Sequence, residues 1–146
     1  QEDRLAFCRD WLDGAETLDA RHQPVAQLAE RTGGDYAAVV FDATGNARSM
    51  ASAFQFVAHG GKLVYVGLVS ADISFHDPDF HRKEMTLLGS RNATAEDFRF
   101  VIDLLRRGAI DTGRYITHRC ALEETVDRFS RWLSPEAGVI KAVIEL

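Results

Sequence analysis

The chain has 146 residues, 46% of them hydrophobic, which is enough for one domain with a real core. Its net charge of -5 and the lack of a lysine- or arginine-rich cluster argue against nucleic acid or an anionic membrane surface as a partner. No apolar run reaches the length of a membrane span, and the start does not read as a signal peptide. The two cysteines, Cys8 and Cys120, match no metal-ligand spacing, so we expect a reducing, cytoplasmic location.

The first third of the sequence is predicted to be mainly helical. Residues 3–12 place Leu5, Cys8 and Trp11 on one helical face, and a second helix begins near Pro24 and ends at Gly33-Gly34. A weak, short strand is predicted between them over residues 16–19. Because the first helix begins with no strand before it, we expect that an upstream part of the fold lies outside this chain.

A β-α-β unit is predicted from residue 35 to residue 68. The apolar run 37–41 reads as a buried strand, and Met50, Ala53, Phe54 and Val57 follow at helical spacing. Gly60-Gly61 is predicted to end that helix, and residues 62–66 form the next strand. Such a crossover requires parallel strands, whose ligands bind beyond the carboxyl ends. We therefore expect a ligand near residues 43–45 and 66–68.

The rest of the sequence continues the alternation of helices and strands. Residues 70–82 are irregular and polar, with Pro78 predicted to break any helix, and residues 85–88 form a third strand. Thr94 and Asp97 form a capping-box-like start for a helix that ends at Gly108. The remaining predicted elements are a short strand at 115–117, a helix over 122–133 and a closing strand at 139–146. Strands alternating with helices indicate an α/β fold, here a Rossmann-like doubly wound parallel sheet.

The ordered motifs resemble the downstream part of zinc-type medium-chain alcohol dehydrogenases, especially the sorbitol and sugar-acid dehydrogenase branch. The motifs are RL-x2-C-x2-WL-x-GAE, VVFDATGN, GGKLVYVGL, KEMTLLGSRN, ITHR and IKAVIEL. The resemblance covers nearly all of the chain. It implies that residues 1–110 are part of a nicotinamide-dinucleotide-binding Rossmann domain, incomplete because the first strand with its glycine-rich loop is missing. Residues 111–146 would return to a catalytic domain absent from this chain.

The resemblance also implies an activity for the parent enzyme. That activity is zinc-dependent transfer of hydride between an alcohol, such as a polyol or sugar acid, and NAD or NADP. The zinc ligands would lie outside this chain, so we expect no catalytic residue and no metal ligand within it, and no activity from the chain alone. The alternatives are a zinc-free, quinone-reductase-like member of the same superfamily or a non-catalytic nucleotide-binding module.

The cofactor-binding residues that the resemblance implies are Arg4, Thr44, Gly45, Val66, Gly67, Leu68, Leu88, Gly89, Ser90 and Lys141. Arg4 would reach the adenosine ribose, Thr44 and Gly45 the adenine, and Lys141 the pyrophosphate. Residues 66–68 would face the nicotinamide ring, where the missing Cβ of Gly67 lets the backbone approach the cofactor. Residues 88–90 would offer backbone groups to the carboxamide. Arg4 as a solvated charge, Gly45 as a plain turn glycine and Lys141 as an exposed strand residue stay open as alternatives.

Arg91 and Asn92 are the expected substrate contacts. In the branch that this sequence resembles, an arginine at the position of Arg91 lies near the substrate. A guanidinium can bind hydroxyl or carboxylate oxygens in a fixed fork, which suits a sugar or a sugar acid. A surface charge paired with Glu84 or Asp97 is an equally open alternative for Arg91.

A homodimer or higher homo-oligomer is expected to form through residues 70–80. In the family this segment pairs with its twin across a two-fold axis. Here Ala71, Ile73 and Phe75 alternate with polar residues, as an edge strand would.

Overall fold

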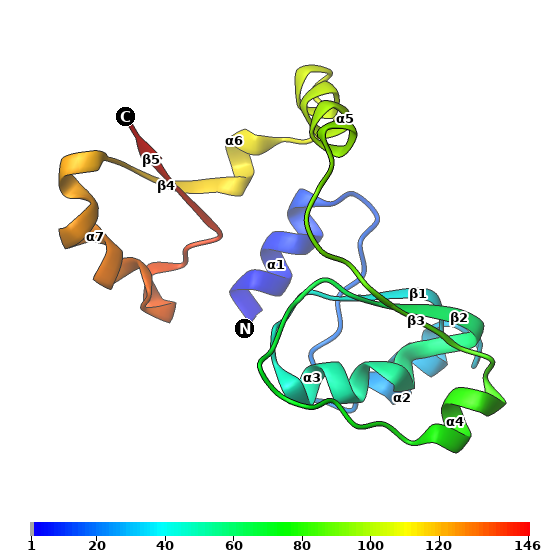
Figure 1. Cartoon of the computed structure of the whole chain (residues 1–146). Coiled ribbons are helices and arrows are strands. Elements are labelled where there is room, and N and C mark those ends of the chain that lie inside the picture. The colour runs from blue at the N-terminus through cyan, green and yellow to red at the C-terminus, as the bar shows by residue number, and fades with distance from the viewer. Residues whose placement is uncertain (1) are drawn as a thin grey trace. The chain divides into compact units, whose positions relative to one another are not determined.

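The computed structural model describes residues 2–146 (Figure 1). Its contacts divide the chain into two compact units. One comprises the residues up to Asp19 together with Ala93–Leu146, and the other is Ala20–Asn92. The division into residues 1–110 and 111–146, which rests on the family resemblance, stays a prediction.

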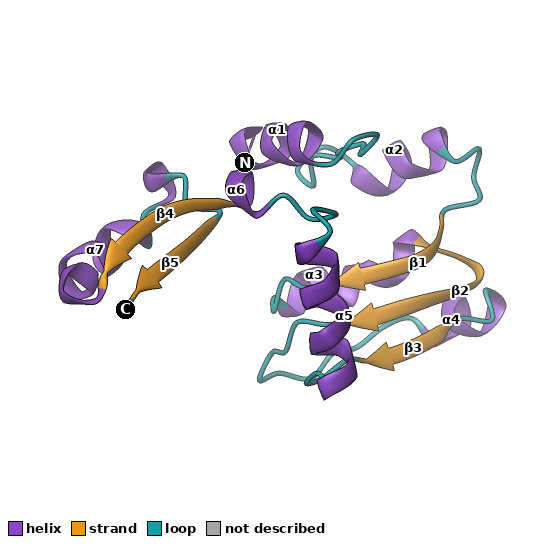
Figure 2. Ribbon diagram, turned by 90° about the horizontal axis from the view of Figure 1, so that it is seen from above, coloured by secondary structure: helices purple, strands orange, loops and turns teal. Residues whose placement is uncertain are grey.

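The unit Ala20–Asn92 is built on a parallel sheet. Its strands are β1 (Ala37–Asp42), β2 (Val57–Tyr65) and β3 (Thr86–Gly89), in the order β1-β2-β3. Both neighbouring pairs are parallel. Figure 2 shows the three arrowheads pointing the same way, so the carboxyl ends of the strands share one edge of the sheet. The predicted parallel α/β architecture is confirmed.

Helices cover one face of this sheet. They include α2 (Pro24–Arg31) and α3 (Ala47–Ser52), with the 3-10 turn η1 (Ala53–Phe56) continuing α3 (Figure 1). Asn46 caps α3 by accepting hydrogen bonds from the backbone N–H groups of Arg48 and Ser49. The core consists of apolar residues from η1, from β2 and from the position just before β3: Ala53, Phe54, Val57, Leu63 and Met85.

The helix predicted between the first two strands is shorter than expected. Val57 was assigned to it by spacing, yet Val57 is the first residue of β2 and is completely buried. The glycines predicted to end the helix lie inside β2, where the register with β1 shifts between Val57 and Lys62. A Cβ on Gly61 would lie 2.8 Å from Val57 Cγ1, so the close approach of the chain at this shift requires glycine. The apolar pattern identified the buried residues correctly but not their conformation.

Three other predictions of local structure are wrong. Pro78 does not prevent a helix, because it lies in the first turn of α4 (Asp77–Arg82), where a missing backbone N–H costs nothing. Residues 70–80 are predicted to pair as an edge strand. In the structure residues 70–76 have no regular secondary structure, and the rest of the segment belongs to α4. The weak strand predicted at residues 16–19 is absent from the described structure as well.

The other unit contains a pair of parallel strands, β4 (Ile116–Ala121) and β5 (Lys141–Glu145). The capping box predicted for α5 (Ala95–Arg106) is present: Asp97 N–H donates to Thr94 Oγ1 at 3.2 Å, and Thr94 N–H donates to Asp97 Oδ2 at 2.7 Å. The remaining elements are α1 (Glu2–Trp11), α6 (Thr112–Tyr115), η2 (Leu122–Glu124), α7 (Thr125–Trp132) and η3 (Pro135–Ala137). In the described range 2–146, none of the helices has the length and apolar character needed to span a membrane.

Candidate functional site

Asp42, the last residue of β1, organises the turn that follows it. Its carboxylate is buried, with the residue only 5% exposed. Oδ1 accepts hydrogen bonds from the backbone N–H of Thr44 at 2.9 Å and from its hydroxyl at 2.7 Å. Oδ2 accepts one from the hydroxyl of Ser49 in α3 at 2.8 Å. These three bonds hold the turn and the start of α3 against the end of β1.

The hydrogen bonds also determine the ionisation of Asp42. Burial by itself raises the pKa of this carboxyl, but the bonds from Thr44 and Ser49 outweigh burial and hold the pKa below its ordinary value. Asp42 is therefore a charged carboxylate. Burial, followed by the negative charge of Asp42, raises the pKa of Tyr65, whose hydroxyl donates to the Met50 carbonyl at 2.7 Å.

Backbone hydrogen bonds connect the loops at the carboxyl edge of the sheet. The carbonyl of Asp42 accepts from the N–H groups of Val66 at 2.8 Å and Gly67 at 2.9 Å. The carbonyl of Tyr65 accepts from the N–H of Ser90 at 2.8 Å. The loops after β1, β2 and β3 are thus joined in order across the edge, and their backbones have fixed positions.

Gly67 is required by the packing of two loops. A Cβ on Gly67 would lie 2.5 Å from the backbone nitrogen of Gly45, in the turn after β1. The close approach of its backbone to a cofactor stays a prediction. Gly45 has a φ of 59°, and its own Cβ position is 3.2 Å from the Leu68 carbonyl oxygen. The two glycines allow the loops after β1 and β2 to pack backbone against backbone.

A groove of about 700 Å³ lies at this edge, within the unit Ala20–Asn92. It brings together the predicted site residues from the loops after β2 and β3: Val66, Gly67, Leu68, Gly89, Ser90, Arg91 and Asn92. Tyr65 and Met50 line it as well. Its size falls in the range of about 300–1,000 Å³ that is usual for small-molecule sites.

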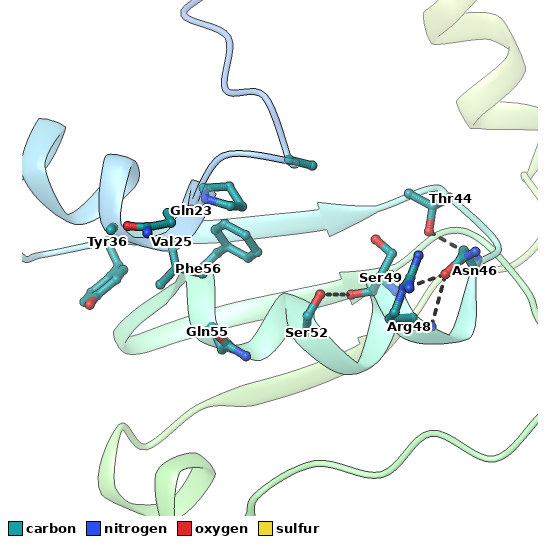
Figure 3. A pocket seen from close by; sticks show the side chains of 13 residues that line it. Gln23, Val25, Tyr36, Thr44, Asn46, Arg48, Ser49, Ser52, Gln55 and Phe56 are labelled. Carbon is teal, nitrogen blue, oxygen red and sulfur yellow. Dashed lines mark hydrogen bonds between the residues drawn. The ribbon is translucent and has the colours of Figure 1, made fainter. Parts of the chain in front are cut away.

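Other predicted residues lie elsewhere. Thr44 lines a separate groove beside α2 and α3 (Figure 3), and Leu88 lies within β3. Arg4 and Lys141 belong to the other unit, where Arg4 Nη2 donates to the Val139 carbonyl at 2.9 Å. Lys141 is the exposed first residue of β5.

Arg91 has no ion-pair partner among the described residues. Its predicted surface partners are engaged differently: Glu84 lies 3.4 Å from His59, and Asp97 accepts hydrogen bonds from Thr94. Of the described residues that line the 700 Å³ groove, Arg91 alone carries a charge. Its guanidinium therefore gives the groove a positive character.

Asp42 and Tyr65 were not identified as site residues from the sequence. A signal for Asp42 exists: an aspartate directly after an apolar strand and two residues before a threonine is typical of an Asx turn, in which the carboxylate binds the backbone two residues on. Tyr65 gave no such signal, because an aromatic residue near the end of a strand is ordinary core composition.

The described residues provide no metal site. Among residues 2–146, no three His, Cys, Asp or Glu side chains are grouped so that they could hold an ion. Cys8 and Cys120 are free thiols.

A parallel sheet with a ligand-sized groove beyond the carboxyl ends of its strands is typical of the Rossmann-type class of α/β fold. The family model described as zinc-binding dehydrogenase matches residues 1–107. The chain belongs to this family, in agreement with the resemblance noted from its motifs.

Individual relatives agree with this assignment. L-galactonate-5-dehydrogenase of Escherichia coli K12 is 41% identical over 119 residues, covering 82% of this chain and 35% of the relative. The structure of 2R,3R-butanediol dehydrogenase from Bacillus subtilis has a TM-score of 0.87 and 24% identity, covering 100% of this chain and 42% of that one. An Escherichia coli CFT073 alcohol dehydrogenase complexed with NADH has a TM-score of 0.85 and 20% identity, with coverage of 100% and 42%. The chain thus spans well under half the length of these relatives.

Replacing Gly67 by alanine is expected to destabilise the protein. The added Cβ would collide with backbone atoms of Gly45, which cannot move independently, and such overpacking costs about 1–3 kcal/mol. Gly89→Ala is the matched control, because a Cβ at Gly89 meets no atom within 4 Å. This control substitution should change the free energy of unfolding by less than about 0.5 kcal/mol. Urea unfolding of the two variants measures the difference, and equal stabilities would contradict the packing role of Gly67.

Asp42→Asn is expected to lower stability by about 1–3 kcal/mol at neutral pH, because a buried, hydrogen-bonded charge is removed. The pKa of Asp42 is lower in the folded state than in the unfolded state. The stability that its ionised carboxylate contributes is therefore fully present above the unfolded pKa of about 3.9, and it is lost as the pH falls through the folded pKa. The stability gap between wild type and Asp42→Asn should therefore shrink below about pH 4.

Urea unfolding from pH 7 to pH 2.5 tests this dependence, with exposed Asp72 replaced by asparagine as the control. Asp72→Asn should follow the wild type throughout. A gap for Asp42→Asn that stays constant across the acid range would show that its carboxylate contributes nothing through its charge.

Proposed function

We propose that the full-length protein is an oxidoreductase that transfers hydride between an alcohol and NAD or NADP. The proposed substrate is a polyol or a sugar acid. Membership of the zinc-binding dehydrogenase family supports the reaction type, and the 41% identity to an L-galactonate dehydrogenase supports the substrate class. The structural observation that carries the proposal is the groove that residues from two strand ends line together with Arg91, whose guanidinium has no ion-pair partner among the described residues.

The groove suits the nicotinamide end of the cofactor. Residues 66–68 and 89–90 line it, and the hydrogen bonds of the Asp42 and Tyr65 carbonyls hold the backbone of Val66, Gly67 and Ser90 in place. A Cβ at Gly89 would meet no atom within 4 Å, so a planar ring can approach the backbone there. When bound, the cofactor supplies the hydride acceptor or donor. The role of this chain is to orient it, and fixed orientation is a large part of catalysis.

The rest of the cofactor is assigned to the other predicted residues. Thr44 and Gly45 would contact the adenine, Arg4 its ribose, Lys141 the pyrophosphate and Leu88 the carboxamide side. In this proposal residues 1–110 belong to the dinucleotide-binding domain and residues 111–146 return to the catalytic domain. The NADH complex of the structural relative supports a dinucleotide as the ligand.

The substrate contacts proposed in this chain are Arg91 and Asn92. Both line the groove, and Arg91 can bind a carboxylate or vicinal hydroxyl groups with two parallel N–H bonds. No His, Cys, Asp or Glu side chain lines the described groove, and the hydroxyl of Tyr65 already donates to the Met50 carbonyl. We assign the family's zinc and the proton-transferring groups to residues outside this chain.

A cytoplasmic location is part of the same proposal. The two cysteines of the chain are free thiols, as is usual in a reducing compartment.

The activity is tested with the full-length protein. NAD+ and NADP+ are each offered with a panel of sugar acids and matched polyols, and reduction is followed by the absorbance of the reduced nicotinamide. The expected result is turnover of one substrate class with one cofactor. The absence of both turnover and cofactor binding would contradict the proposal.

Arg91→Ala is expected to raise KM or lower kcat/KM for the substrate by about tenfold or more, since a charge-assisted bond is worth at least 1.4 kcal/mol. The KM for the cofactor should change little. Arg99→Ala, an exposed arginine of α5, is the matched control. Steady-state kinetics, with the substrate and the cofactor varied separately, distinguishes an effect on substrate binding from one on cofactor binding. Unchanged KM and kcat/KM for the substrate would show that Arg91 is only a surface charge.

Self-association through residues 70–80 is also proposed. The segment follows the loop after β2, β3 is an edge strand, and most of residues 70–80 are exposed. Within one chain Phe75 stacks on Phe54 with ring centroids 4.4 Å apart. Contacts between two copies would therefore be made by the residues on either side of Phe75. Light scattering at high protein concentration should give at least a dimer. Ile73→Asp should shift the mass toward the monomer, and a wild-type monomer would contradict the proposal.

A further inference from the structure

The segment between β2 and α4 forms one wall of the groove at the carboxyl edge of the sheet. Leu68, Val69, Ala71 and Ile73 line the groove from this segment. Figure 2 shows the arrowhead of β2 and helix α4 at opposite ends of the sheet, so the segment has to cross the unit Ala20–Asn92 between them. The position of this wall therefore decides the shape of the groove.

Hydrogen bonds do not hold this wall in place. The last backbone bond before it joins the Gly67 N–H to the Asp42 carbonyl at 2.9 Å, and the next ones, to the His76 carbonyl, belong to the start of α4. Between them, no hydrogen bond or ion pair joins residues 68–75 to any other residue in the range 2–146 that the structure describes. Fixing each residue of an irregular segment costs conformational entropy, so this wall needs another source of order.

Phe75, just beyond the lining residues, provides that order. Its ring stacks on the ring of Phe54 in η1, with centroids 4.4 Å apart and planes inclined by 24°. It also meets the ring of Phe80 in α4, with centroids 5.2 Å apart. Phe54 is 7% exposed and belongs to the core, so Phe75 attaches the segment to the core of the unit. Aromatic pairs of this kind attract one another beyond the area that they bury.

The same rings also support other parts of the groove. Phe54 meets Tyr65 edge to face, with ring centroids 6.3 Å apart. Tyr65 lines the groove, and so does Met50, whose carbonyl accepts the Tyr65 hydroxyl. The stack of Phe75 on Phe54 thus links the wall to the residues that line the rest of the groove.

We infer that Phe75 is a positioning residue for the cofactor. It does not line the groove itself. By stacking on Phe54 it holds residues 68–73 where the nicotinamide end of NAD or NADP rests against them. This inference rests on the proposed function, which assigns the cofactor to this groove. Without the stack the segment occupies other positions, and the apparent affinity falls in proportion to the fraction of molecules that have the wall in place.

Calorimetric titration of the full-length protein with NADH and with NADPH tests the inference. Phe75→Ala should raise the Kd of the cofactor that binds by about tenfold, which corresponds to a wall in place in about a tenth of the molecules. Phe75→Tyr keeps the ring and should bind as the wild type does. Phe100→Ala, which removes an exposed phenylalanine of α5, is the matched control and should leave the Kd unchanged. At saturating cofactor and substrate, kcat of Phe75→Ala should stay close to the wild-type value, because the bound cofactor selects molecules whose wall is in place.

Limited proteolysis measures the order of the wall without any ligand. Thermolysin cuts before bulky apolar residues, and mass spectrometry identifies cleavage before Val69 or Ile73. This cleavage should be faster in Phe75→Ala than in the wild type and in Phe100→Ala, since it requires the segment to leave its position. Phe75→Leu, which keeps an apolar side chain but not the ring, takes the place of Phe75→Ala if the alanine variant does not fold, and the same directions are expected.

Several results would overturn the inference. They are an unchanged cofactor Kd in Phe75→Ala, a wild-type rate of cleavage in that variant, or an equal loss of affinity in Phe75→Tyr. A loss of affinity that light scattering traces to a change in oligomeric mass would assign the effect to an interface between copies instead. A wild type with neither cofactor binding nor turnover would overturn the proposed function and the effect on the cofactor with it. Cleavage before Ile73 would then still decide whether Phe75 anchors the segment.

Discussion

The carboxylate of Asp42 is the interaction on which the carboxyl edge of the sheet depends. A buried charge is costly unless it is fully hydrogen-bonded, and here three donors from Thr44 and Ser49 supply that compensation. The same residue uses its carbonyl to bind the N–H groups of Val66 and Gly67. One residue thus fixes the turn after β1, the start of α3 and the loop after β2.

The hydrogen bonds and glycine contacts at this edge fix the loops that line the groove. A groove built from several loops binds with precision only if its segments cannot shift relative to one another. The contact between Gly45 and Gly67 removes the space in which the first two loops could move, and the Tyr65–Ser90 bond extends the connection to β3. Arg91 and Asn92 directly follow Ser90, whose backbone is held by this bond, so the start of this irregular segment has a fixed position.

Sequence reasoning identified the parallel sheet, the strand ends and the residues of one groove, because these depend on apolar periodicity and on the direction of parallel strands. It failed where two conformations bury the same residues. Val57 fits a helical stripe and a strand equally well, and only the register shift beside Gly61 decides between them. The prediction that Pro78 breaks a helix is wrong because the first turn of a helix tolerates proline. The roles of Asp42 and Gly67 depend on contacts between separate loops, which no local pattern reports.

The distribution of charge connects the two grooves. The chain has 22 acidic residues, yet none lies between Ala43 and Ala71 or between Met85 and Ala95. Helical arginines elsewhere, such as Arg107 and Arg128, have a carboxylate one turn away. Arg48 and Arg91 lie in the acid-free segments and are left without such a neighbour, one in each groove. Unpaired guanidinium groups beside a desolvated wall attract anions more strongly than paired ones. An acidic protein thus has an arginine without an acidic neighbour in each of these two grooves.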